Sequence, residues 1–300
     1  MFNYSQQAGL NCHLIRNFSN FSTFTELFVA LNIASSITAT LGNALILIAL
    51  QKESTLNPPS KLFLRCMAFS DLSVGLLAQP AVVISFLFAV YQRWDLCLIS
   101  EYISFFFNTI FTGFSCATIT IVSVDRHLAL LLRNRYRQVV TIKRARIVVL
   151  LFLFASTANC FIVLISTNVF IIFNFIMWSS WILLSIYCYM RIFLTLKTHI
   201  RAQITPQGQP NGISPENLLR YRKTVSTVLW LFAAMIICYF PFALVFIAHS
   251  ATSQTISSMM IFYFAISLVH FNSSLNPLLY CWKIREIRNA VKEILRNLAW

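Results

Sequence analysis

The sequence predicts an all-α membrane protein, a bundle of seven transmembrane helices followed by a short amphipathic eighth helix. Two observations carry this prediction. The 300 residues are 58% hydrophobic and only 11% charged, with a mean hydropathy of +0.72, which is too apolar for an ordinary soluble domain. Six glycines and eight prolines leave no room for long flexible linkers, and no repeat of fixed period is present. One compact membrane domain is therefore expected.

Seven apolar segments account for the spans, since a bilayer core takes about 20 mostly apolar residues per helix. In chain order they are Phe24 to Leu50, Leu62 to Val90, Ile99 to Leu132, Ile147 to Ser166, Val169 to Leu196, Val225 to Ala248 and Ser257 to Trp282. The chain then divides into an N-terminal segment (1–23), the membrane bundle (24–282) and a C-terminal segment (283–300).

The basic residues set the direction of the bundle. They cluster in the connections after the first, third and fifth spans and beyond the seventh, while only Arg16 and Arg93 fall on the other side. Since loop Lys and Arg mark the cytoplasm, we expect the N-terminus outside and the C-terminus inside, in a multi-pass protein of the plasma membrane. The net charge of +14 then reflects topology and contact with the lipid bilayer, and no nucleic acid is expected as a partner.

Three N-glycosylation triplets support the same orientation. They begin at Asn3, Asn17 and Asn20, all before the first span, on the side of the membrane where such acceptors are modified if the N-terminus faces outside.

The C-terminal segment predicts an amphipathic helix. Apolar residues recur at spacings of three and four from Ile284 to Leu298, and basic residues lie between them. This pattern is typical of a helix lying on the inner membrane surface.

Polar residues inside the spans are candidates for function, because a charge within the bilayer is costly. Asp71 in the second span is the deepest. It is either a carboxyl capped by neighbouring hydroxyls or a cation or proton site shared with polar groups at matching depth, namely Asn43, Ser115, Asn272, Ser273 and Asn276. Pro241 and Pro277 break the backbone hydrogen bonding of the sixth and seventh spans. A transporter or channel that uses Asp71 and the broken seventh helix is one interpretation of these features.

The sequence does not favour an enzyme. It lacks a glycine-rich phosphate loop, a His-Glu-x-x-His motif and cysteines paired at metal spacing, and its Ser, His and Asp residues stand in no triad context.

Five motifs, taken together, point to one receptor family. They are Gly42-Asn43 in the first span, "MAFSDL" in the second, Asp125-Arg126-His127 closing the third, Cys238-x-x-Pro241 in the sixth and Asn276-Pro277-x-x-Tyr280 in the seventh. In order and spacing they resemble the rhodopsin-like (class A) G protein-coupled receptors over nearly the whole chain. The resemblance implies a receptor that binds an extracellular ligand and activates heterotrimeric G proteins by outward movement of the sixth helix.

The resemblance also assigns a switch at the cytoplasmic end. Arg126 would pair with Asp125 at rest and turn to the G protein on activation, when Tyr189 and Tyr280 approach it. The switch set comprises Asp125, Arg126, His127, Tyr189, Asn276, Pro277 and Tyr280.

The switch departs from the family pattern in two places. His127 replaces the commoner tyrosine. Twenty residues before Pro241 stands Tyr221, where some relatives have a glutamate that clasps the arginine, so a weaker resting lock and some basal activity are expected.

Asp71, Ser115, Asn272 and Asn276 match the family's sodium pocket, and an allosteric Na⁺ is expected there. No other cofactor is implied.

The family's usual disulfide cannot form, because Glu101 stands where its cysteine in the third helix would be and the outer loop after the fourth span, about Ser166 to Asn168, contains no cysteine. Of the eight cysteines only Cys12 and Cys97 are placed clearly outside, and a bridge between them could form.

Two subfamilies share features with this chain. The short second outer loop and the missing helix-3 cysteine resemble melanocortin receptors, and the run from Ser267 to Arg288, which includes His270, is similar to the end of adenosine receptors. Phe246 replaces an asparagine of the adenosine receptors, and most of the acidic calcium cluster of melanocortin receptors is missing.

Single residues argue against two classes of ligand, amines and retinal. Asn108 replaces the aspartate that binds amines, and His270 replaces the lysine that binds retinal. The remaining pocket favours a small, neutral or weakly polar ligand. The residues expected to line it are Gln79, Asn108, Thr112, Tyr239, Phe242, Phe246 and His270.

Overall fold

The structure, a computed structural model, describes residues 4–15, 22–53, 57–132, 135–204, 215–251 and 255–298. In the described ranges every element is a helix. The elements are α1 (Tyr4–Ile15), α2 (Ser22–Lys52), α3 (Pro58–Ser73), the π-helical turn η2 (Val74–Ala78), α4 (Gln79–Val90), α5 (Trp94–Leu132), α6 (Tyr136–Val139), α7 (Ile142–Ile165), α8 (Thr167–Ile204), α9 (Pro215–Ala251), α10 (Ile256–Lys283) and α11 (Arg285–Leu298).

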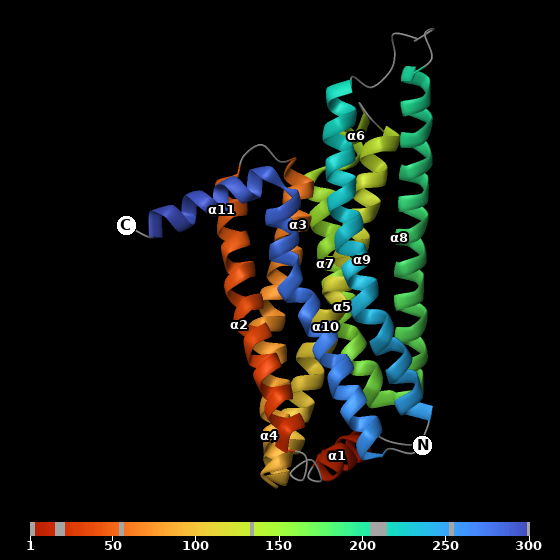
Figure 1. Ribbon diagram of the computed structural model, residues 1–300. Helices are drawn as coiled ribbons and strands as arrows, with labels where there is room; N and C mark the ends of the chain where they lie inside the picture. The colour runs from red at the N-terminus through yellow and green to blue at the C-terminus, as the bar shows by residue number, and fades with distance from the viewer. Residues whose placement is uncertain are drawn as a thin grey trace.

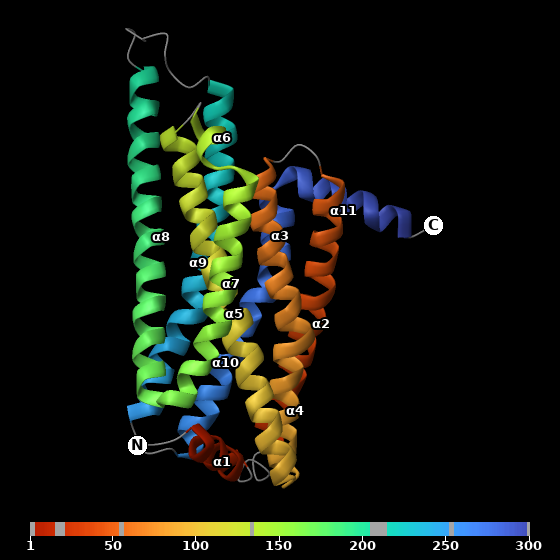
Figure 2. The ribbon, with the colours of Figure 1, turned by 180° about the vertical axis from the view of Figure 1, so that it is seen from behind.

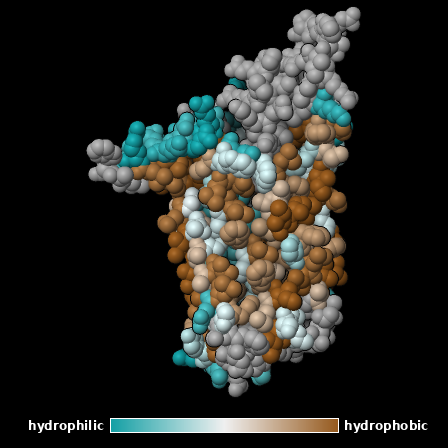
Figure 3. All heavy atoms as spheres, in the orientation of Figure 1, coloured by the Kyte–Doolittle hydropathy of each residue, from teal (hydrophilic) through white to brown (hydrophobic). Residues whose placement is uncertain are grey.

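The long helices run side by side as one bundle, with α1 across one end and α11 projecting from the other (Figures 1 and 2). Among the described residues, six helical stretches are long and apolar enough to cross a membrane, and α9 adds a shorter apolar stretch, Phe232–Ala248. Apolar side chains cover much of the visible side of the bundle (Figure 3). The predicted seven-helix membrane fold is confirmed.

Several predicted boundaries differ from the observed ones. α8 continues beyond the predicted end at Leu196 to Ile204, and α9 begins at Pro215, before the predicted start at Val225. Polar residues beyond a bilayer can continue a helix that the apolar run has begun. The outer connection between α7 and α8 is Ser166 alone, in extended conformation, which is shorter than the predicted loop.

The second span is interrupted in its middle. Pro80 has no N–H to donate, and the chain resolves this by widening one turn into η2, where the Gln79 N–H bonds the Val74 carbonyl. Gly75 lies in this turn, and the Ser36 hydroxyl donates to its carbonyl oxygen at 2.7 Å. The absence of a side chain at Gly75 lets α2 approach closely.

Polar side chains also connect α2 to α10. The Asn32 amide donates to the Ser267 hydroxyl at 2.8 Å, and the Ser274 hydroxyl donates to the Ser35 carbonyl at 2.9 Å. Such bonds between small residues stabilise helix pairs in lipid, where no hydrophobic driving force acts between helices.

The amphipathic C-terminal helix forms as predicted, but its apolar stripe does not simply face lipid. Ile287, Val291 and Ile294 are buried in the same core as Ile46 and Leu50 of α2. α11 is thereby packed against the bundle, and the prediction that its apolar face rests on the membrane surface was incomplete.

Candidate functional site

Arg126 lies near the α11 end of the bundle and is held by two neighbours. Its Nε donates to Asp125 Oδ2 at 3.0 Å, and its Nη2 contacts both Asp125 and the Ser60 hydroxyl of α3. Ser60 in turn donates to Asp125 Oδ2 at 3.1 Å. Only 16% of the Arg126 side chain is exposed, so the guanidinium is held within the bundle.

Asp125 has a further partner that the sequence analysis missed. Tyr136 lies in the short helix α6, and its hydroxyl donates to Asp125 Oδ1 at 2.6 Å. Burial, together with the Asp125 carboxylate, raises the pKa of Tyr136 to about 12, so the hydroxyl keeps its proton and remains a donor. Neither Tyr136 nor Ser60 carries a local sequence signal, since both reach Asp125 only through the packing of helices.

The two switch tyrosines, on α8 and α10, are both buried. The Tyr189 hydroxyl accepts a hydrogen bond from Ser123 at 2.9 Å, and the Tyr189 ring lies 5.2 Å from that of Phe232. Tyr280 is fully buried, and its hydroxyl has no hydrogen-bond partner in the described part of the chain.

His127, which replaces the commoner tyrosine of the family, contacts another helix than Arg126 does. Its ring contacts that of Tyr187 edge-on at 6.1 Å. His127 therefore faces α8, while Arg126 faces Ser60 of α3.

Asp71 is the centre of a polar cluster inside the bundle. Its Oδ1 accepts from Ser115 at 3.2 Å and from Ser273 at 2.9 Å, and its Oδ2 accepts from Asn276 at 2.6 Å. Three of the four residues predicted for this site, Asp71, Ser115 and Asn276, are thus brought together. Ser273 is an additional member.

Asn272, the fourth predicted member, makes no contact with Asp71 through a hydrogen bond. Both polar atoms of its amide are buried and unpaired among the described residues, as is Oδ1 of Asn276. Buried polar groups without partners are rare and call for a physical explanation such as water or an ion.

Pro277 follows this cluster and packs directly on α2. A Cβ on Gly42 would meet the Pro277 ring at 2.9 Å, so the glycine makes room for the proline. Asn43, the next residue, donates to the Ala39 carbonyl at 2.8 Å and to the Ser273 carbonyl at 3.0 Å. The second of these bonds links α2 to α10 one turn from Pro277.

Two predicted pocket residues meet across the bundle. His270 Nε2 and Asn108 Oδ1 lie 2.6 Å apart, and the Asn108 amide nitrogen donates to the Ser104 carbonyl at 2.8 Å. Because the Asn108 oxygen can only accept, His270 Nε2 carries the hydrogen. In the neutral imidazole Nδ1 is then an acceptor, and this atom is buried and unpaired within the described ranges.

The predicted aromatic residues form a connected group. The Trp178 ring lies 5.9 Å from both Tyr239 and Phe242, and Phe242 lies 5.7 Å from Phe246. Trp178 of α8 was not predicted, because on an apolar helix it could equally have faced lipid.

The other two predicted pocket residues are buried without a hydrogen bond between them. Gln79 is completely buried and its two amide atoms have no partner in the described part of the chain. Thr112 is 8% exposed. Both lie on helices that line the bundle interior.

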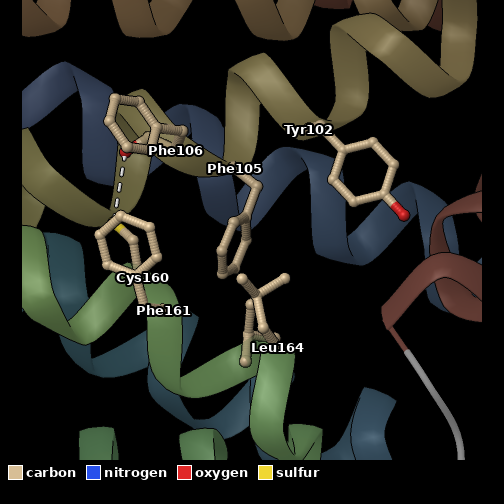
Figure 4. A pocket seen from close by; sticks show the side chains of 7 residues that line it. Tyr102, Phe105, Phe106, Cys160, Phe161 and Leu164 are labelled. Carbon is tan, nitrogen blue, oxygen red and sulfur yellow. Dashed lines mark hydrogen bonds between the residues drawn. The ribbon is translucent and has the colours of Figure 1, made fainter.

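A separate hollow of about 200 Å³ lies between α5 and α7 (Figure 4). It contains none of the predicted ligand residues. Its lining is almost entirely apolar and consists of Tyr102, Phe105, Phe106, Cys160, Phe161, Val163 and Leu164.

The chain matches the family model described as "7 transmembrane receptor (rhodopsin family)" over residues 42–174 and 160–280. These ranges contain every switch and sodium residue discussed above. The chain belongs to this family.

Three similar proteins illustrate the receptor's position within the family. It is 25% identical to the human adenosine receptor A2a over 91% of this chain and 73% of that protein. It is 27% identical to the chicken adenosine receptor A2b over 92% and 90%, and 25% identical to the rat melanocortin receptor 3 over 90% and 84%.

Membership decides several questions at once. The receptor is a multi-pass plasma-membrane protein that signals through G proteins, and it is not an enzyme. The transporter or channel interpretation of Asp71 gains no support from the family or from these relatives.

The receptor's N-terminal region contains a helix that the sequence analysis did not predict. α1 packs against α4, α5 and α10, and a disulfide joins its Cys12 to Cys97 at the start of α5. The predicted glycosylation sites Asn3, Asn17 and Asn20 lie outside the described residues.

Proposed function

We propose that the receptor binds a small, neutral or weakly polar extracellular ligand and activates a heterotrimeric G protein through outward movement of α9. In this proposal the α1 end of the bundle faces outward and the α11 end faces the cytoplasm, because the basic residues gather at the latter end. The ligand would lie among Gln79, Asn108, Thr112, Tyr239, Phe242, Phe246 and His270.

The arrangement of Arg126 carries the proposal. Asp125 and Ser60 hold the Arg126 guanidinium, and Tyr136 is bonded to the same carboxylate. A guanidinium held in this way can exchange this set of partners for another. The pairing of Arg126 with Asp125 is the one expected of the resting state of such a switch.

The chemistry of the pocket supports the ligand class. His270 offers an acceptor at Nδ1, Gln79 offers a donor and an acceptor, and the neighbouring side chains are aromatic. No pocket residue is an acid, so a ligand amine would lack a counterion there. Adenosine and melanocortin receptors among the relatives make nucleosides and peptides the first compounds to test, followed by lipids.

A sodium ion fits the Asp71 cluster as an allosteric partner. Asp71 supplies the negative charge, and Ser115, Asn272 and Asn276 supply neutral oxygen atoms, two of which are buried and unpaired. Hard oxygen donors of this kind suit an alkali cation. We expect NaCl to raise the thermal stability of the purified receptor above that in choline chloride. An Asp71→Asn receptor with the same sodium response would refute the site.

The decisive experiment measures cAMP and calcium in transfected cells exposed to nucleosides, lipids and peptides. An active ligand should give a response that Arg126→Ala abolishes, whereas Arg135→Ala, which removes an exposed arginine at the same end, should leave it intact. A ligand response that survives Arg126→Ala, or an ion flux without G protein dependence, would overturn the proposal.

A further inference from the structure

A lysine and two tryptophans meet where α9 passes the end of α10. Lys283 Nζ lies 3.6 Å from the ring centre of Trp282 and 5.1 Å from that of Trp230. The two indole rings are themselves 5.5 Å apart. Trp230 belongs to α9, whereas Trp282 and Lys283 end α10. We call these three residues the indole–lysine cluster.

Both distances to the indole rings are within the range of a cation–π attraction, which extends to about 6 Å from the ring centre. Trp230 and Trp282 are 47% and 57% exposed, so the cluster lies at the edge of the bundle. Lys283 is in the last turn of α10, where the partial negative charge of the helix end favours a cation. The lysine is therefore well placed to connect the two helices.

The other described contacts of α9 with neighbouring helices are uncharged, and one of them is the hydrogen bond between Tyr239 and Cys116 of α5. They include Phe232 against Tyr189 and Phe242 against Trp178. Neither salt bridge found within the described ranges, Lys52–Glu293 and Arg126–Asp125, involves α9. Lys283 is thus the charged group seen to hold this helix in the part of the chain that the structure describes.

The sequence indicates why such a contact would be needed. Tyr221 stands at the α9 position from which a glutamate pairs with the arginine in some related receptors. A tyrosine is uncharged at neutral pH and cannot form this ion pair. The side chain of Tyr221 lies outside the described residues.

We infer that the indole–lysine cluster holds α9 against α10 in the resting state and opens on activation. The inference rests on the proposed outward movement of α9. It adds to the pairing of Arg126 with Asp125 a second resting contact, at the edge of the bundle.

The geometry shows how movement would open the cluster. Trp230 precedes the helix-breaking Pro241 by eleven residues, which is about 16 Å of helix. A tilt of about 20° at the proline, the size of an ordinary kink, would move Trp230 by roughly 5 to 6 Å. The 5.1 Å contact would then lie well outside the range of a cation–π attraction.

The test compares ligand-independent G protein output per receptor at the cell surface. Trp230→Leu and Lys283→Gln should each raise it about two- to five-fold, the change expected from losing one exposed cation–π contact. The double variant should exceed neither single variant, because both remove the same contact. Lys283→Arg should stay near the wild type, since arginine also binds aromatic faces.

Two controls accompany the variants. Lys292→Gln removes an exposed charge from α11 away from α9, and Phe240→Leu removes an exposed ring from the lipid side of α9. Both should leave the output unchanged. Adding Arg126→Ala to Trp230→Leu should abolish the raised output if it passes through the proposed switch.

A second readout does not depend on a G protein. Spin labels at Leu229→Cys and Leu295→Cys, with Cys66 and Cys281 replaced by alanine, would report the distance between α9 and α11. Trp230→Leu and Lys283→Gln should populate longer distances. If neither variant lengthens the distance, the inference is wrong. If the distances lengthen but no variant or ligand produces G protein output, the indole–lysine cluster does hold α9 against α10, and the proposed function fails.

Discussion

Gly75 provides the most direct test of how closely the helices are packed. A Cβ at this position would lie 2.7 Å from Thr40 Oγ1, 2.9 Å from the Thr40 backbone nitrogen and 3.0 Å from Ala39 Cβ. Two of these atoms belong to backbone or to a short side chain that cannot rotate away. Gly75→Ala must therefore separate α2 from η2.

The expected magnitude follows from two opposing effects. Overpacking of a rigid contact costs about 1–3 kcal/mol, whereas replacing glycine by alanine in a helix contributes about 0.5–1 kcal/mol of stability. We expect a net destabilisation of about 0.5–2 kcal/mol. The bond from Ser36 to the Gly75 carbonyl, 2.7 Å long, should weaken as the two helices move apart.

Gly113 is the matched control. A Cβ there would meet the nearest atom, Ser156 Oγ, at 3.5 Å, which is an ordinary contact. Gly113→Ala should thus leave the receptor as stable as the wild type, or more stable by about 0.5–1 kcal/mol.

Thermal unfolding of the purified receptors in detergent measures both changes. Gly75→Ala should lower the midpoint by a few degrees, and Gly113→Ala should keep or raise it. Equal shifts for the two variants would show that the close approach at Gly75 does not determine the loss of stability.

Two further predictions concern single hydrogen bonds. Tyr136→Phe removes the 2.6 Å bond to Asp125. Since bonds to charged groups contribute about 1.5–3 kcal/mol, ligand-independent cAMP or calcium output should rise by about tenfold or more, and an unchanged output would show that this bond persists in the active state. Asn159→Leu breaks the reciprocal amide pair with Asn174 between α7 and α8, with bonds of 3.0 and 3.3 Å. It should lower unfolding stability by about 0.6–2 kcal/mol, and an unchanged unfolding midpoint would mean that lipid or water replaces the pair at no cost.

The predicted spans agree with the helices to within a turn or two at most ends, because apolar runs of this length have few alternatives in a bilayer. The interruption at η2 was not predicted. Pro80 and Gly75 were both visible in the sequence, but whether the missing hydrogen bond produces a kink or a wide turn depends on the helix that packs against it.

The site residues divide in the same way. Asp71, Asp125 and Arg126 were found from sequence, since a charge in or at the edge of an apolar run is costly and therefore conspicuous. Ser60 and Tyr136 were missed. A hydroxyl in a membrane helix can bond its own backbone, so nothing in its sequence context shows which carboxylate it will reach.

The sequence alone determined the class of the protein, the number of its spans and the identity of the polar groups buried within them. This is possible because the free energy of transfer into lipid depends on each residue type separately. Tertiary structure decided the partners. The contact of Lys283 with Trp230, the sharing of Asp71 by α5 and α10, and the packing of α1 against the bundle through Cys12 and Cys97 all join residues from different helices. Their meeting depends on the rotation and depth of each helix, which are set by the fit of side chains along whole interfaces.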